Sequence, residues 1–134
     1  MSDNLAQVKI LIVDDQPVSR TLLRGCLNHL GIKHVVNAED GRAALAMLEA
    51  ERFSLVITDL YMPRMNGMQF LQQIRKQTGT RDLPVIVVSG ENEKKRVIQA
   101  LEAGADAFVI KPFSSETLKK KIIAVLSKKT QTTA

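Results

Sequence analysis

Five short aliphatic runs, separated by longer amphipathic stretches, constrain the fold of this chain more than any other feature. The runs predict β-strands at 8–13, 33–37, 55–58, 84–88 and 107–110. Three of them are nearly continuous apolar segments, which is typical of strands covered on both faces by crossover helices. Strict alternation of strand and helix over 134 residues predicts one α/β domain, a three-layer α/β/α sandwich around a five-stranded parallel sheet with right-handed crossovers.

Apolar residues recur at helical spacing between the runs, and each set predicts one buried helix stripe. The stripes are Val18, Leu22, Leu23, Cys26, Leu27 and Leu30; Phe70, Leu71 and Ile74; Val97, Ile98 and Leu101; and Leu118, Ile122, Val125 and Leu126. The alanine-rich segment 40–51 is expected to form a further helix. Ser114 or Ser115, after Pro112, is expected to cap the last one.

The length and composition suit a single domain with one substantial core, since 45% of the residues are hydrophobic and 25% are charged. We expect an N-terminal extension at 1–7, the folded domain at 8–127 and a polar tail at 128–134. The first residues are polar and acidic, unlike a secretory signal, and no apolar run approaches the roughly 20 residues that span a bilayer. A cytoplasmic protein without a membrane segment is therefore expected.

Neither the single cysteine nor the positive charge indicates a particular partner. Cys26 lies in an apolar helix stripe without partner cysteines, so it is expected to be a small buried side chain. The net charge of +5 is not accompanied by a nucleic-acid-binding motif, so direct nucleic-acid binding is not expected. The basic runs 94–96, 119–121 and 128–129 are expected to be solvated faces, with contact to an acidic partner as the alternative.

Polar side chains that can carry chemistry follow four of the five predicted strands. Asp14 and Asp15 follow the first, Asp59 the third, Ser89 the fourth and Lys111 the fifth. The carboxyl ends of parallel strands meet at one edge, where ligands bind in open α/β sheets. Carboxylates gathered there repel one another unless a cation joins them or some become protonated. Oxygen-only ligands favour Mg²⁺, often together with phosphate. The pattern therefore predicts a magnesium and phosphate site.

Each of these elements has an ordinary alternative when taken alone. The acids before Pro17 could start a helix. Asp59 could be a loop acid, and Asn66 with Gly67, or Ser89 with Gly90, could be plain turns. Their occurrence together at one sheet edge favours a functional site, because independent turn residues have no reason to supply acids, a hydroxyl and a lysine there.

Further residues extend this pattern into a family motif. They are Val13 before the paired acids; Met62, Pro63, Asn66 and Gly67 after Asp59; Gly90 after Ser89; and Pro112 and Phe113 after Lys111. With them, the segment 8–126 resembles the receiver domains of two-component response regulators, the chemotaxis receivers in particular. The resemblance implies a flavodoxin-like sheet of strand order 2-1-3-4-5. It also suggests a cis bond between Lys111 and Pro112.

The resemblance implies a role for each site residue. Asp59 would accept a phosphoryl group, and Asp14, Asp15, Asp59 and the Tyr61 carbonyl would hold Mg²⁺. Ser89 and Lys111 would contact the phosphoryl oxygens. Gly90, where many relatives are thought to have alanine, would leave room for the phosphodonor and loosen its loop.

The resemblance also implies how the signal would be passed on. The donor would be a histidine kinase or a phosphotransfer protein. Ser89 and Phe108 would form a switch that alters a partner-binding face on the last two helices. Tyr61 and Glu91 would modulate dephosphorylation. Such a protein is a signalling switch and not a metabolic enzyme, since it catalyses only its own phosphorylation and dephosphorylation.

Two other functions remain as alternatives. A phosphohydrolase with an aspartyl nucleophile would carry an acid two residues after it, where this chain has Tyr61. A flavodoxin-like flavin binder would need a Ser/Thr/Gly-rich loop after the first strand, where the acids of 14–15 would repel phosphate.

Overall fold

The structure is a computed structural model that describes residues 5–90 and 94–132, with side chains to 127. Its elements, in chain order, are η1 (Leu5–Gln7), β1 (Lys9–Val13), α1 (Pro17–His29), β2 (His34–Ala38), α2 (Gly41–Ala50), β3 (Leu55–Thr58), α3 (Gly67–Lys76), β4 (Val85–Ser89), α4 (Lys94–Glu102), β5 (Ala107–Ile110) and α5 (Ser115–Thr132). The expected strands are all present, although β2 lies one residue further along and β4 includes Ser89.

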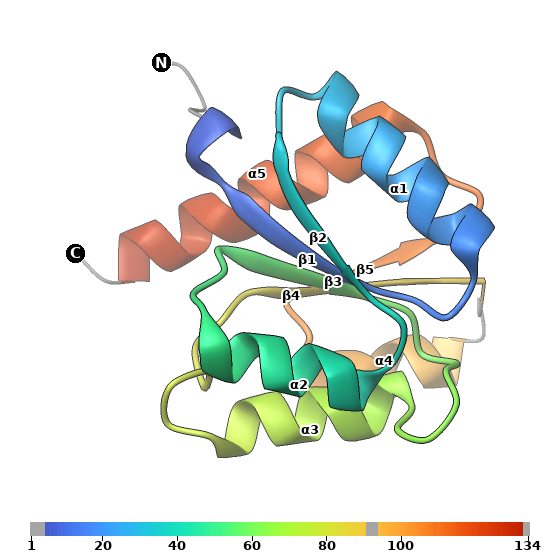
Figure 1. The fold of residues 1–134 in the computed structure, drawn as a ribbon, viewed down its shortest axis with the longest axis vertical. Helices are drawn as coiled ribbons and strands as arrows, with labels where there is room; N and C mark the ends of the chain where they lie inside the picture. Colours follow the sequence, from blue (N-terminus) through green and yellow to red (C-terminus); the bar gives the residue numbers. More distant parts are fainter. Residues whose placement is uncertain (1–4, 91–93, 133–134) are drawn as a thin grey trace.

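The five strands form one parallel sheet in the order β2-β1-β3-β4-β5, which confirms the expected topology. Helices α1 and α5 cover one face of the sheet, and α2, α3 and α4 cover the other (Figure 1). The three layers follow from strands that are apolar on both sides: Ile10 and Ile12 face α1 and α5, whereas Leu11 and Val13 face the opposite helices.

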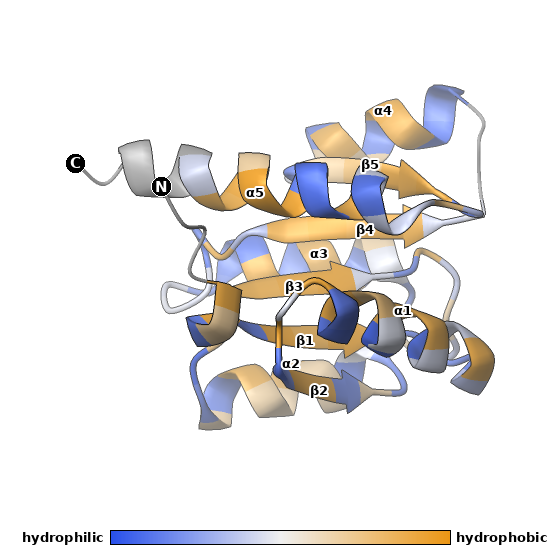
Figure 2. Cartoon of the chain, turned by 90° about the horizontal axis from the view of Figure 1, so that it is seen from above, coloured by the Kyte–Doolittle hydropathy of each residue, from blue (hydrophilic) through white to orange (hydrophobic). Residues whose placement is uncertain are grey.

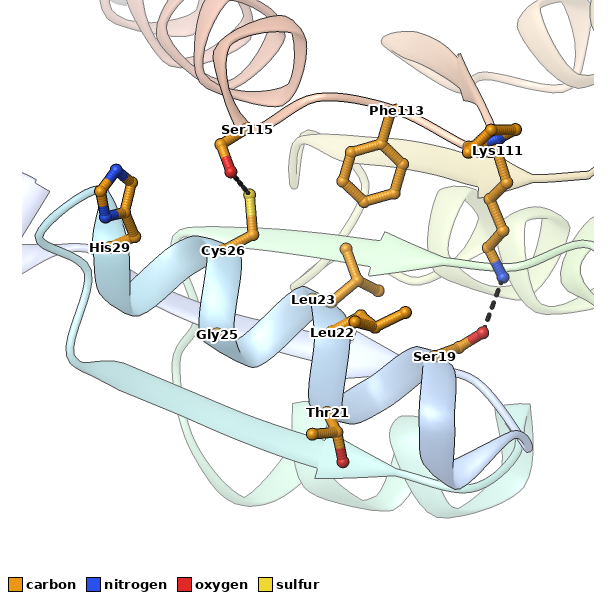
Figure 3. A pocket seen from close by; sticks show the side chains of 11 residues that line it. Ser19, Thr21, Leu22, Leu23, Gly25, Cys26, His29, Lys111, Phe113 and Ser115 are labelled. Atoms are coloured by element: carbon orange, nitrogen blue, oxygen red, sulfur yellow. Dashed lines mark hydrogen bonds between the residues drawn. The ribbon is translucent and has the colours of Figure 1, made fainter.

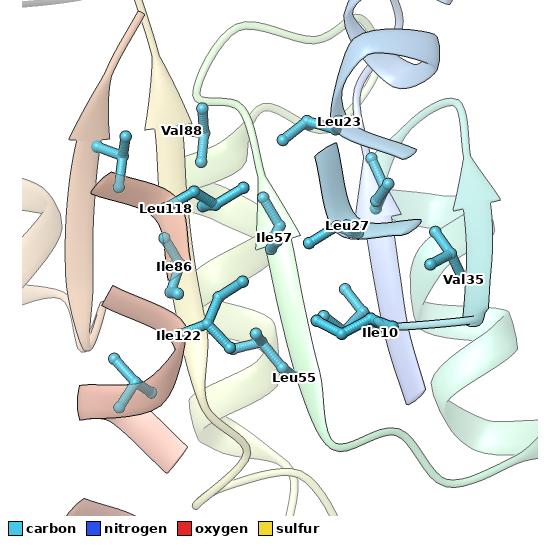
Figure 4. Close-up of a cluster of buried hydrophobic side chains, with 14 of the residues drawn as sticks. Ile10, Leu23, Leu27, Val35, Leu55, Ile57, Ile86, Val88, Leu118 and Ile122 are labelled. Carbon is cyan, nitrogen blue, oxygen red and sulfur yellow. The ribbon is translucent and has the colours of Figure 1, made fainter. Parts of the chain in front are cut away.

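Apolar side chains fill both spaces between sheet and helices. Under α1 and α5, Leu23 and Leu27 meet Ile57, while Leu118 and Ile122 lie over the strands beside it (Figure 4). The expected stripe of α5 is thus confirmed at Leu118, Ile122 and Val125. Figure 2 shows hydrophobic strands, whereas the helices carry both hydrophobic and hydrophilic residues. Within the described residues, no helix is both long and apolar enough to cross a membrane.

Two of the expected helix stripes are wrong in part. On α1, Val18 and Leu22 are 71% and 66% exposed. Successive helical residues point about 100° apart, so Leu22 turns outward when its neighbour Leu23 packs on the sheet. On α4, Ile98 and Leu101 are 44% and 43% exposed, and the small Ala100 makes the buried contact instead.

The ends of the helices also refine the expectations. Ser114 is the cap of α5, because its Oγ accepts the N–H of Thr117 at 3.1 Å. Helix α5 continues to Thr132, so it extends into the segment that was expected to be a polar tail. The domain boundaries themselves remain predictions. Leu5, expected in the extension, is buried against the core.

Arg75, in the last turn of α3, links two loops at the amino end of the sheet. Its guanidinium donates to the carbonyls of Leu83 at 2.6 Å and Gly104 at 2.6 Å. It also pairs with Asp106 at 3.0 Å. Gly104 has a φ of +114°, and a Cβ there would lie 2.8 Å from the Arg75 Nε atom. The carboxyl end of α4 is therefore held firmly to α3.

Candidate functional site

The chemical side chains expected at the carboxyl edge of the sheet do lie there. Asp14 follows β1, Asp59 follows β3, Ser89 ends β4 and Lys111 follows β5. The first three are buried, with Asp14 1%, Asp59 9% and Ser89 0% exposed. The Lys111 N–H donates to the Ser89 carbonyl at 2.8 Å, and the Asp59 N–H donates to the Val13 carbonyl at 3.0 Å. These hydrogen bonds join the carboxyl ends of β5 and β4 and those of β3 and β1.

Lys111 brings two of the acids together. Its Nζ atom donates to Asp59 Oδ2 at 2.9 Å and to Asp14 Oδ2 at 3.2 Å. Burial alone would lower the pKa of Lys111, but the hydrogen bond and charge of Asp59, followed by those of Asp14, raise the pKa above its ordinary 10.5. The site therefore holds a protonated ammonium group between two carboxylates.

The Asp59 carboxylate is fixed from both sides. Its Oδ1 atom accepts the backbone N–H groups of Leu60 at 2.6 Å and Tyr61 at 3.2 Å. Its other oxygen faces Lys111. Three donors thus orient this carboxylate, which is the arrangement expected of a positioned nucleophile.

Asp14 does not cap α1, since Gln16 is the N-cap and has no side-chain cap hydrogen bond, but its carboxylate holds the turn that leads into the helix. Its Oδ1 atom accepts the Gln16 N–H at 2.9 Å, just before Pro17 begins α1. The Asp14 carbonyl accepts from Arg20 at 2.6 Å. Asp15 is half-buried beside it. One carboxylate oxygen of Asp14 therefore holds the turn before α1, whereas the other faces Lys111.

The donor set at this edge can be compared with the needs of a metal. In the described part of the chain, no three Asp, Glu, His or Cys side chains close around a common point. The Asp14 and Asp59 carboxylates nevertheless lie within about 3 Å of the same cationic atom. The ligand set expected from the sequence, Asp14, Asp15, Asp59 and the Tyr61 carbonyl, consists of oxygen atoms alone, which is the chemistry that suits Mg²⁺.

The loop between β3 and α3 is tightly constrained. Asn66 caps α3, accepting the Gln69 N–H at 2.9 Å, while the Gln69 side chain accepts the Asn66 N–H at 3.0 Å. The Gly67 N–H donates to the Leu60 carbonyl at 2.8 Å. These contacts hold the residues that follow Asp59 against the first turn of α3, so the Asn66 and Gly67 pair is more than an ordinary turn.

An ion pair ties the same loop to α2. Arg64, whose φ is +66°, lies 2.7 Å from the Asp40 carboxylate. Asp40 caps α2 by accepting the Ala43 N–H at 2.9 Å. That N–H lowers the pKa of Asp40; burial opposes the change, but Arg64 and the Arg42 N–H lower the pKa further. Sequence reasoning missed this pair, since nothing in the motif indicates where an exposed arginine points.

The structure places the expected switch residues on one face of the sheet. Ser89 pairs with Ile110, and Phe108 pairs with Val87, so Ser89 and Phe108 are diagonal neighbours. Phe108 is half-buried and packs against the cluster beneath α2, α3 and α4. Tyr61 is 53% exposed. Glu91, the other residue expected to modulate dephosphorylation, lies outside the described residues.

Two further details concern Lys111. The bond between Lys111 and Pro112 is cis, as expected. Ser19, which sequence reasoning missed, accepts from Lys111 Nζ at 3.1 Å. A serine in the first turn of a helix carries no sequence signal for such a contact.

Comparison with known proteins agrees with this geometry. Residues 10–123 match the family model described as the response regulator receiver domain. The chain is 38% identical over 115 residues to the chemotaxis protein CheY of Pseudomonas aeruginosa, covering 86% of this chain and 93% of that protein. It is also 38% identical to the chemotaxis protein CheY-3 of Vibrio cholerae, covering 86% of this chain and 88% of that protein.

Solved structures of similar proteins have the same fold. Vibrio cholerae CheY4 superposes with a TM-score of 0.81 at 33% identity, covering 88% of this chain and 98% of that chain. The receiver domain of the Pseudomonas aeruginosa sensor histidine kinase PA1611, solved with magnesium in its active-site cleft, superposes with a TM-score of 0.82 at 27% identity, covering 90% and 98%. This chain therefore belongs to the response regulator receiver domain family of two-component signalling.

Proposed function

We propose that this domain accepts a phosphoryl group on Asp59 from the phosphohistidine of a histidine kinase or phosphotransfer protein. The orientation of the Asp59 carboxylate, bonded by two backbone N–H groups and by Lys111, carries this proposal. A carboxylate oxygen attacks phosphorus while the bond from phosphorus to the donor nitrogen breaks. The imidazole leaves with that electron pair.

Asp14, Asp15, Asp59 and the Tyr61 carbonyl are the residues that would hold Mg²⁺. Their all-oxygen chemistry supports this, as does the magnesium found in the active-site cleft of the related PA1611 receiver. The ion, when bound, offsets the negative charge that spreads over the phosphoryl oxygens. Lys111 adds a second positive charge, which its two acidic neighbours keep protonated. The Ser89 hydroxyl is the expected third contact.

Loss of the phosphoryl group would occur by attack of water on the same phosphorus atom. Tyr61 supports this part of the proposal, because its N–H binds Asp59 while the residue is 53% exposed to solvent. The domain thus catalyses only its own phosphorylation and dephosphorylation, and the phosphorylated form lasts until water gains access.

The partner-binding face is proposed on α4, β5 and α5. Among the described residues, Ile98, Leu101 and Ile110 are three of the six exposed large apolar side chains. Apolar side chains grouped on a surface are typical of a protein interface. The diagonal positions of Ser89 and Phe108 on neighbouring strands support a switch that connects the phosphoryl site to this face.

Phosphorylation with acetyl phosphate and Mg²⁺, followed by intact mass measurement, tests the proposal. The wild-type chain should gain one phosphoryl group, and Asp59→Asn should gain none. Asp14→Ala should weaken Mg²⁺ binding while keeping the nucleophile. Asp82→Asn removes an exposed acid elsewhere and serves as the control. An undiminished adduct in Asp59→Asn would show that another residue is the acceptor.

A further inference from the structure

The Lys111 ammonium has three acceptors among the described residues, and Ser19 is the only uncharged one. Ser19 lies in the first turn of α1, and its Oγ accepts from Nζ at 3.1 Å. The other two acceptors are the carboxylates of Asp59 and Asp14. An ammonium group has three N–H donors, so these contacts use all of them.

The proposed chemistry changes both carboxylates. Asp59 becomes an acyl phosphate, so its carboxyl group is no longer charged and the negative charge lies on the phosphoryl oxygens. Asp14 is one of the proposed magnesium ligands, so its oxygens are drawn toward the ion. The Ser19 hydroxyl takes part in neither change. It is the acceptor that stays constant while the partners of Lys111 are exchanged.

The surroundings of Lys111 leave its side chain room to move. Ser19 and Lys111 both line a cavity of about 740 Å³ between α1 and the segment from β5 to α5. Figure 3 shows Lys111 extending toward Ser19, with Leu22, Leu23 and Phe113 lining the same cavity. A lysine side chain is long and flexible. Without a neutral anchor, the ammonium group can swing away from the strand ends when the acids change partners.

We propose that Ser19 is a positioning residue, which holds the Lys111 ammonium at the sheet edge where it meets the phosphoryl oxygens. This inference rests on the proposed function of Asp59. Ser19 would act through Lys111 alone, and the expected effect falls on the rate of phosphorylation at saturating donor. The donor concentration at half-maximal rate and the melting temperature should stay the same.

Three variants test this role. Ser19→Ala removes the acceptor, and Ser19→Thr keeps a hydroxyl. Thr21→Ala changes another residue that lines the cavity, on the same helix. With acetyl phosphate and Mg²⁺, Ser19→Ala should lower the saturating rate roughly five- to tenfold, the effect of losing one hydrogen bond. Ser19→Thr should recover most of that rate, and Thr21→Ala should match the wild type.

A second measurement does not depend on phosphorylation. With Mg²⁺ added and no phosphodonor, ¹³C relaxation of the Lys111 side chain should show greater mobility at Cε in Ser19→Ala, with wild-type mobility in Ser19→Thr. If Ser19→Ala left the Lys111 mobility or the saturating rate unchanged, Ser19 would not be a positioning residue. The proposed phosphorylation of Asp59 would not be affected by that result. A wild-type chain that gains no phosphoryl group on Asp59 would instead overturn the proposed function.

Discussion

Gly67 lies against the backbone of Asp59, so closely that a Cβ at position 67 would stand 2.1 Å from the Asp59 carbonyl oxygen. It would also stand 2.6 Å from the Leu60 Cα atom. Both neighbours are backbone atoms, so rotation of a side chain cannot relieve the overlap. The position of Asp59 therefore depends on glycine at the start of α3.

Gly67→Ala should lower the free energy of unfolding by about 2–3 kcal/mol, because the new methyl group must push the two backbone segments apart. Phosphorylation of Asp59 should slow as well, since that movement disturbs the carboxylate. Gly79→Ala is the matched control, because a Cβ there meets no described residue within 4 Å. Urea unfolding measures both variants. Equal stability of Gly67→Ala and wild type would show that the loop adapts freely.

The lowered pKa of Asp40 leads us to expect a specific pH dependence of the folding stability. Its folded-state pKa is lowered, mainly by the Ala43 N–H, and further by Arg64 after the opposing effect of burial. A lowered folded-state pKa gives stability that is present above the ordinary value of 3.8 and lost as the pH falls through the folded-state pKa. Asp40→Asn should therefore be less stable than wild type at neutral pH, and the difference should shrink below pH about 4.

Asparagine is a suitable test residue at position 40 because it also caps helices well. Urea unfolding of Asp40→Asn and wild type at several pH values separates the effect of the Asp40 charge on stability from that of its helix-capping hydrogen bond. Asp82→Asn, at an exposed position, controls for loss of a negative charge. A stability difference that stays constant from neutral pH to below pH about 3 would contradict the assignment of the pH dependence to Asp40.

The lifetime of the phosphoryl group should depend on Tyr61 and Glu91. Tyr61→Ala should speed hydrolysis several-fold, because under the proposed function the aromatic ring of this exposed residue obstructs the attacking water. Glu91→Ala should slow it, because a carboxylate there could orient the attacking water. Loss of phosphoryl mass after removal of the donor measures both rates. Unchanged decay in both variants would mean that water access does not limit hydrolysis.

The switch should depend on the Ser89 hydroxyl. Phosphorylation, or its mimic beryllofluoride with Mg²⁺, should shift the NMR signals of Phe108 and nearby residues as the hydroxyl moves toward the phosphoryl group. Ser89→Ala should reduce those shifts sharply at full modification of Asp59, whereas Ser89→Thr should retain them. Shifting the populations of two conformations from 1:99 to 99:1 needs only about 5.5 kcal/mol of difference in their interaction with the phosphoryl group. If the shifts persisted unchanged in Ser89→Ala, Phe108 would be a static core residue that takes no part in a switch.

The sheet and the main site residues could be predicted from the sequence for a common physical reason. Parallel strands buried on both faces are continuous apolar runs, and their carboxyl ends meet at one edge. The sequence pattern alone therefore groups Asp14, Asp59 and Lys111 at that edge. The apolar runs do not mark where hydrogen bonding stops, so the end of β4 at Ser89 was missed by one residue.

The contacts that sequence reasoning missed depend on the rotation of helices and on loop geometry. Leu22 and Leu23 are adjacent and equally apolar, yet only Leu23 is buried. Their burial depends on how α1 is rotated on the sheet. The same rotation places Ser19 beside Lys111. Arg64 reaches Asp40 from a backbone with φ of +66°, which composition does not indicate for arginine.

Because Arg75 holds Gly104, α4 can tilt about its carboxyl end. Along α4 as described, only Ala100 is buried, so the body of the helix is lightly held while the backbone just beyond its carboxyl end is fastened to α3. Nine residues at about 1.5 Å per residue give an arm of roughly 13 Å, so a tilt of about 10° about Gly104 would carry the amino end about 2 Å. The same tilt hardly moves Gly104 itself. Displacement would therefore be greatest at Lys94, the end of α4 that follows the segment after Ser89.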